Sequence, residues 1–139
     1  MTTTTKTLTQ FIVSITLITV VFRITLSSLL NSELYDYVFI PPAIYFISMF
    51  LAGRYFGKKD YKFLPIGDIG FRFHLSTFVV FFLVSYSFNY LGYMSQWEPR
   101  RILDITLMIW GVFLLVHFIF YLNAQKTTIK GLDKNDLFE

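Results

Sequence analysis

Two apolar stretches, LSTFVVFFLVSYSFNYLGYM (residues 75–94) and ILDITLMIWGVFLLVHFIFYL (residues 102–122), are joined by the short polar turn SQWEPRR (residues 95–101). Each stretch is long enough to cross a bilayer hydrocarbon core of ~30 Å as a helix. With their flanks, they predict a transmembrane helical hairpin over residues 74–94 and 102–123. Each arm carries one histidine, His74 on the first and His117 on the second.

The composition of the whole chain supports this class of protein. The 139 residues are 55% hydrophobic, 20% aromatic and only 15% charged, which is too apolar for an ordinary soluble domain. The absence of cysteine excludes disulfides, thiolate metal sites and cysteine nucleophiles. Although the net charge is +3, the basic residues flank apolar runs, which indicates membrane topology and no nucleic-acid partner.

The residues upstream predict a second hairpin, with helices over 8–30 and 37–56. Pro41-Pro42 would fall in the first turn or two of its second helix, where a missing N–H costs little. A polar connection follows at 57–73, and a polar tail occupies 124–139. We expect one all-α domain over 1–139, a bundle of four transmembrane helices. The first helix lacks a small-residue cleavage site, so we expect it to remain as an anchor.

The positions of lysine and arginine predict the orientation. The first turn has neither residue, whereas the second connection with its flanks and the tail are rich in both. The positive-inside rule then places both termini in the cytoplasm, with Glu33, Trp97 and Arg100 outside and Lys59 and Lys134 inside.

The second hairpin also carries a family resemblance. The segment GFRFHLSTFVV (residues 70–80) resembles the first helix of the bacterial two-transmembrane (2TM) domain family, which opens with Gly-Phe and then His-Leu. Trp110, Gly111, Leu114 and His117 resemble the signature of the family's second helix, and Asn89 falls near an asparagine common late in its first helix. The resemblance covers about Ile66–Gln125, under half of the chain.

Two positions depart from the family pattern. Phe82 replaces an expected asparagine, and Phe113 replaces an expected second glycine, which implies a bulkier helix interface. The resemblance implies a sensory or regulatory protein of the bacterial inner membrane. Some members of the family carry an attached signalling output module, and we expect none within these 139 residues.

His74 and His117 form the first candidate site. If helices three and four are antiparallel neighbours, both imidazoles lie at a similar depth near the cytoplasmic side. Together they would suit a haem iron, a divalent metal ion or a proton-linked switch. The alternative is that each histidine hydrogen-bonds a helix carbonyl or interfacial water, because two histidines without a carboxylate or thiolate are a weak metal signal.

Arg23 and Asp104 form the second candidate site. Thr16, Thr19, Arg23 and Ser27 share one face of the first helix, and lipid cannot satisfy an arginine. We expect Arg23 to face the bundle and to pair with Asp104, with Glu33 or Asp36 as reserve partners. The alternative is that Arg23 extends to the outer headgroups.

Lys58, Lys59 and Lys62 are candidates for contact with anionic lipid or a cytosolic partner, although such lysines more often only set topology. No sequence motif indicates catalysis, so we expect no enzyme. We predict a small regulatory or accessory membrane protein that binds a membrane-protein partner or itself. The alternatives are an oligomeric pore lined by the Thr16–Ser27 face, and a haem- or metal-binding protein that uses His74 and His117.

Overall fold

The computed structural model describes the backbone of residues 6–60 and 66–130 and the side chains of residues 6–59 and 70–123. Its elements in chain order are α1 (Lys6–Asn31), the 3-10 helix η1 (Tyr35–Tyr37), α2 (Ile40–Asp60), α3 (Ile66–Tyr90) and α4 (Arg100–Lys130). All four α-helices are long and apolar enough to cross a membrane. The prediction of an all-α chain with four such helices is therefore confirmed.

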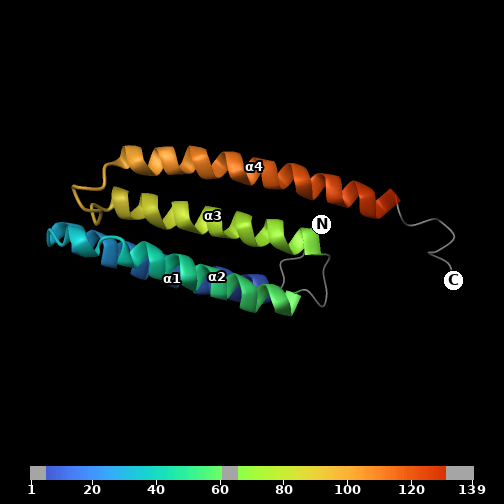
Figure 1. Cartoon of the computed structure of the whole chain (residues 1–139), viewed down its shortest axis with the longest axis horizontal. Coiled ribbons are helices and arrows are strands. Elements are labelled where there is room, and N and C mark those ends of the chain that lie inside the picture. Colours follow the sequence, from blue (N-terminus) through green and yellow to red (C-terminus); the bar gives the residue numbers. More distant parts are fainter. Residues whose placement is uncertain (1–5, 61–65, 131–139) are drawn as a thin grey trace.

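The helices lie roughly antiparallel in succession (Figure 1). α1, α2 and α3 pack against one another, with fewer contacts between α2 and α3, whereas α4 packs mainly against α3. α4 lies at the edge of the bundle and extends past the other helices towards the C-terminus (Figure 1). Because the helix number is even, α1 begins at the same end of the bundle at which α4 finishes. We call this the terminal end, and the opposite one the turn end.

Helix boundaries differ from the sequence prediction. α3 begins at Ile66 instead of residue 74, so much of the expected polar connection is helical. α4 begins at Arg100 and continues to Lys130, into the expected tail. α2 begins at Ile40, and Pro41 and Pro42 occupy its first turn as predicted, where their missing N–H groups leave no helical bond unmade.

Two helices of the bundle end in the same way at the turn end. After α3, Tyr93 N–H donates to Phe88 O and Gly92 N–H donates to Asn89 O, with Gly92 at φ 75°. These are the paired bonds of a Schellman motif. After α1, Leu34 N–H donates to Leu29 O and Glu33 N–H to Leu30 O, with Glu33 at φ 58°. Glu33 thus holds a left-handed conformation that favours glycine.

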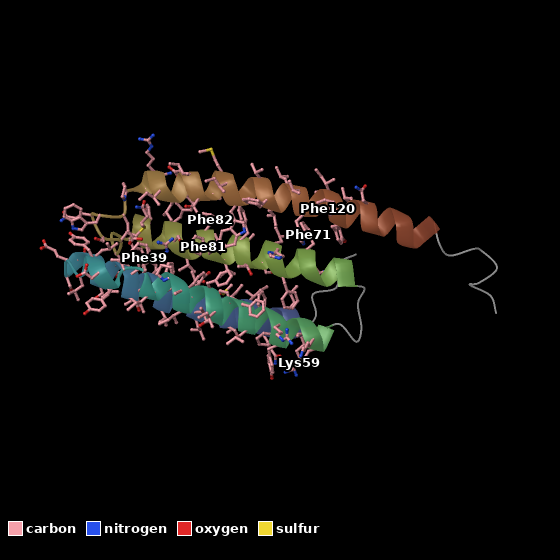
Figure 2. All side chains as sticks on the ribbon, viewed as in Figure 1. Phe39, Lys59, Phe71, Phe81, Phe82 and Phe120 are labelled. Atoms are coloured by element: carbon pink, nitrogen blue, oxygen red, sulfur yellow. The ribbon has the colours of Figure 1, made fainter. Side chains whose placement is uncertain are left out.

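The core lies between α1 and α3. Phe11 and Ile15 of α1 pack with Phe73 and Val80 of α3, and the buried residues of α1 recur every fourth position through Thr19, Arg23 and Ser27. Large apolar side chains on the remaining faces project outwards (Figure 2). The bundle is therefore apolar outside and partly polar inside, as expected for a chain surrounded by lipid.

Candidate functional site

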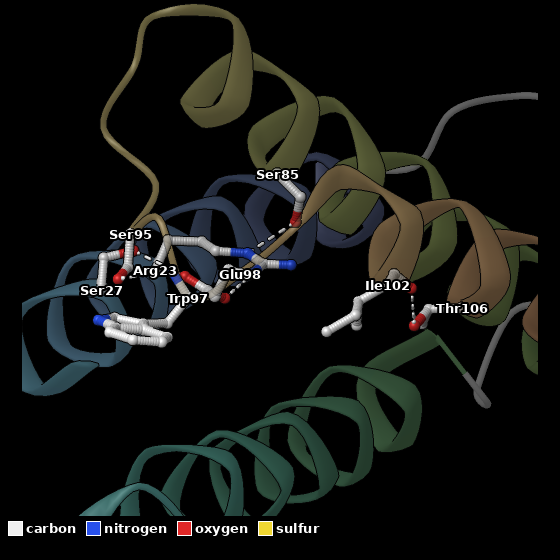
Figure 3. A network of polar contacts seen from close by, with 8 residues as sticks. All are labelled: Arg23, Ser27, Ser85, Ser95, Trp97, Glu98, Ile102 and Thr106. Atoms are coloured by element: carbon white, nitrogen blue, oxygen red, sulfur yellow. Dashed lines mark hydrogen bonds and ion pairs between the residues drawn. The ribbon is translucent and has the colours of Figure 1, made fainter. Parts of the chain in front are cut away.

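Arg23 is the centre of a buried polar cluster at the turn end. Its Nε donates to Ser85 Oγ at 2.8 Å, and one terminal nitrogen donates to Glu98 Oε1 at 3.0 Å. Ser27 Oγ donates to Glu98 Oε2 at 2.9 Å. The side chains of Arg23 and Glu98 are only 4% and 12% exposed. We call Arg23, Ser27, Ser85 and Glu98 the Arg23 network; it joins α1, α3 and the α3–α4 loop (Figure 3).

The loop conformation brings Glu98 to Arg23. Gly92 turns the chain at the end of α3, and the buried Ser95 then organises the next residues. Its carbonyl accepts from Glu98 N–H at 3.0 Å, and its hydroxyl accepts from Trp97 N–H at 3.3 Å. The carboxylate therefore points from the loop back towards α1 (Figure 3).

Aromatic rings complete the surroundings of Arg23. Its guanidinium carbon lies 5.3 Å from the ring centroid of Phe22 and 5.0 Å from that of Phe81. Cation–π contacts of this kind are strongest where water is excluded. One turn away, Thr19 Oγ lies 3.2 Å from Tyr45 Oη, which links α1 to α2. Every described buried side-chain nitrogen and oxygen has a hydrogen-bond partner.

The predicted partner of Arg23 was wrong. Arg23 does face the bundle, but its carboxylate partner is Glu98 and not Asp104. Asp104 Oδ1 instead accepts from Tyr86 Oη at 2.7 Å and lies 3.9 Å from Arg100 Nε. The physical reason is that α4 packs mainly against α3, so a carboxylate in its first turn meets α3 and its own helix. The loop, in contrast, reaches across to α1.

His74 and His117 meet across the interface between α3 and α4, as predicted. Their ring centroids are 4.8 Å apart, with an angle of 54° between the ring planes. Gly70 lies beside the pair, and a Cβ at that position would be in ordinary contact with His117 Nε2, at 3.8 Å. Phe71 packs on Phe118 and Tyr121 one turn towards the terminal end. We call His74 and His117 the histidine pair.

The separation of the rings bears on what they could bind. With metal–nitrogen bonds of about 2.0 Å, two imidazoles on opposite sides of a haem iron have centroids at least roughly 6 Å apart. The observed 4.8 Å is shorter, and is closer to the roughly 5 Å expected for two ligands of one tetrahedral ion. Within the described residues, no group of three or more His, Asp or Glu side chains is arranged to hold a metal ion.

The predicted lysine site is only partly described. Lys59 Nζ donates to Tyr55 Oη at 2.8 Å and lies 4.2 Å from the centroid of that ring. It projects from the terminal end of α2 (Figure 2), and Lys58 beside it is exposed. Lys62 lies outside the described residues.

Comparisons with known proteins do not assign this chain to a family. No protein-family model matches the chain, and no curated protein or solved structure matches it. The resemblance to the 2TM domain therefore stays a prediction.

Sequence reasoning did not find Glu98 or Ser85. The sequence did carry one signal, the depth of each residue along its helix. Ser85 stands a little over one turn before the end of α3, at the level of the arginine of α1. Glu98 is the one acidic residue of the α3–α4 turn, which follows at the same end.

Proposed function

We propose that this protein is a small, non-catalytic integral membrane protein, with both termini cytoplasmic, that acts as a regulatory or accessory subunit by binding other membrane proteins. The Arg23 network carries this proposal. The polar groups of this buried cluster bond to one another and tie three parts of the chain together. The outer surface of the bundle is then left to contact other proteins.

The same network makes the polar face of α1 unsuitable as the lining of a pore. A pore lining must meet water, yet Thr19, Arg23 and Ser27 are buried within one chain and are paired there. Opening such a conduit would break the Arg23–Glu98 pair. We therefore favour partner binding over conduction.

α4 is the element best placed for a partner. Its membrane-spanning stretch has the highest hydropathy of the four, and it lies at the edge of the bundle with one side on α3. Val112 and Phe113 on its outer surface are 61% and 69% exposed. The neighbouring Gly111 has no atom within 4 Å of an added Cβ, which leaves room for close approach of another helix.

Site-specific photocrosslinking in the native membrane tests this role. A photoreactive phenylalanine analogue at Phe113 should give an adduct of one defined mass, either with a second copy or with another protein. The matched control is Leu51, which is 57% exposed on α2, a helix that packs mainly on α1. Adducts at neither position, or the same diffuse adducts at both, would contradict a partner surface on α4.

The histidine pair favours a second candidate function, the binding of a small divalent cation. Two imidazoles at this separation could share one ion, which would take its other ligands from water. Purified protein should then bind Zn²⁺ or Co²⁺ with a stoichiometry of one, and His117→Leu should abolish binding. A Soret band in purified protein would instead favour haem. Unchanged metal binding in His117→Leu would remove the histidine pair from consideration.

A further inference from the structure

A groove between α2 and α3 occupies the terminal half of the bundle. Its volume is about 560 Å³, within the ~300–1,000 Å³ typical of small-molecule sites. The walls are mainly apolar and aromatic, and include Phe46, Phe50, Phe73 and Trp110. The groove exists because α2 and α3 both pack on α1 and make fewer contacts with each other. We call it the α2–α3 groove.

Glycines keep the groove open. Gly53 and Gly57 lie one turn apart on the α2 wall, and a Cβ added to either would meet no atom within 4 Å. Larger side chains at these positions would project into the space. The groove is therefore a feature of the residues that line it and not only of the helix directions.

Polar groups gather at one end of the groove. Arg54 and His74 both line it near the terminal end, whereas its other end is formed by Tyr45 and Trp110. The described side chains include four carboxylates, those of Glu33, Asp36, Glu98 and Asp104, and all lie at the turn end. Among described side chains, no acid therefore neutralises Arg54, and the groove offers a cation to an anionic group.

The length of the groove fits one leaflet of a bilayer. Its α2 wall runs from Tyr45 to Gly57, roughly 18 Å at ~1.5 Å per residue. Half of a ~30 Å hydrocarbon core is about 15 Å. The charged end would lie near the headgroups, and the aromatic end near the midplane. This is the shape of a phospholipid with its phosphate at the surface and one acyl chain pointing inwards.

We propose that the α2–α3 groove binds one anionic phospholipid, whose headgroup pairs with Arg54 beside His74 and whose acyl chain lies over Gly53 along the aromatic wall. The proposal rests on the membrane location of the proposed function but not on its partner-binding role. Arg54 provides the selectivity for negative charge, because arginine binds phosphate through charge-assisted hydrogen bonds. The glycines provide the space for the chain.

Native mass spectrometry of purified protein mixed with phosphatidylglycerol or phosphatidylcholine tests the proposal. Wild-type protein should retain one phosphatidylglycerol and exchange phosphatidylcholine freely. Arg54→Gln should weaken retention roughly tenfold or more. Gly53→Leu should block it, because the space beside an added Cβ is open and the new side chain would occupy the groove. Inorganic phosphate should not compete, since the acyl chain is part of the ligand.

Matched substitutions serve as controls. Gly111→Leu places the same side chain in open space on α4, outside the groove, and Arg101→Gln removes a cation at the turn end. Both should retain phosphatidylglycerol as wild type does. Equal retention of the two lipids, or unchanged retention in Gly53→Leu, would overturn the proposal. So would a change of oligomeric state in Gly53→Leu without loss of lipid, which would assign the groove to a second copy. Membrane extraction of the same variants reports location separately.

Discussion

At the scale of single residues, Arg23 is a cation held inside the bundle by several contacts at once. Transfer of a cation to the centre of a membrane costs about 2.5–3.5 kcal/mol on insertion scales. Arg23 avoids this cost through a carboxylate, a hydroxyl and two aromatic faces at once. A salt bridge this deeply buried is strong only while complete, because removal of one member strands the other.

We therefore predict strong coupling between Arg23 and Glu98. Glu98→Leu should destabilise the bundle by about 3–5 kcal/mol, because it leaves a buried guanidinium without its counter-charge. Arg23→Leu/Glu98→Leu should cost less than the sum of the two single changes. A double-mutant cycle on reversible unfolding in detergent measures the difference.

The exposed pair of Arg100 and Asp104 provides the control for this cycle. These side chains are 70% and 46% exposed and lie 3.9 Å apart, so their coupling should stay within about 0–1 kcal/mol. If the free-energy changes of Arg23→Leu and Glu98→Leu add to within about 0.5 kcal/mol of the change in the double variant, the pair makes no net contribution to folding.

At the scale of elements, the sequence predicted the helices better than their ends. Runs of apolar residues reveal a span, because hydropathy depends only on composition. Ends depend on local conformation, and residues 66–73 mix glycine and charge in a way that indicated a loop, although α3 already begins at Ile66. The loop that carries Glu98 was equally hidden, since its path depends on Gly92 and on the hydrogen bonds of Ser95. The depth of a carboxylate in the membrane was therefore not enough to predict which one pairs with Arg23.

The two Schellman ends predict opposite effects of glycine exchange. Glu33→Gly should stabilise the bundle by up to about 1 kcal/mol, because it relieves a left-handed conformation that costs a side chain about 1–2 kcal/mol. Part of this gain is offset, because glycine increases the conformational entropy of the unfolded chain. Gly92→Ala should destabilise the bundle by a similar amount and also loosen the loop that holds Glu98. Unfolding of both variants in the same detergent provides the comparison. A destabilised Glu33→Gly would mean that the carboxylate makes a stabilising contact.

At the scale of the whole molecule, the two ends differ in charge in a way that hydropathy does not show. The turn end has all of the described carboxylates, together with Arg23, Arg100 and Arg101. The terminal end has Lys6, Arg54, Lys58, Lys59 and Arg72 among described residues. At the turn end, the α1–α2 turn and the α3–α4 loop also contact each other, since the rings of Tyr35 and Trp97 have centroids 6.2 Å apart. Among the described side chains, one end is thus basic and the other is nearly balanced.

This asymmetry predicts that the terminal end faces the cytoplasm, because lysine and arginine near the ends of spans are retained on that side. The chain contains no cysteine, so each introduced thiol is a unique probe. With a membrane-impermeant maleimide, Glu33→Cys and Arg100→Cys should label in intact cells. Lys59→Cys and Lys134→Cys should label only after permeabilisation. Leu83→Cys, on an exposed apolar face midway along the bundle, should label in neither case.

Each of the other labelling patterns has a distinct meaning. If position 59 but not position 33 were labelled from outside, the orientation of the protein would be the reverse of the predicted one. The basic end would then lie outside, contrary to the positive-inside rule. Labelling of positions 33 and 59 from the same side would mean that α2 does not span, although its length and hydropathy allow it. In the expected pattern, the headgroup end of the α2–α3 groove opens to the cytoplasmic leaflet, where anionic lipids give the surface its negative potential.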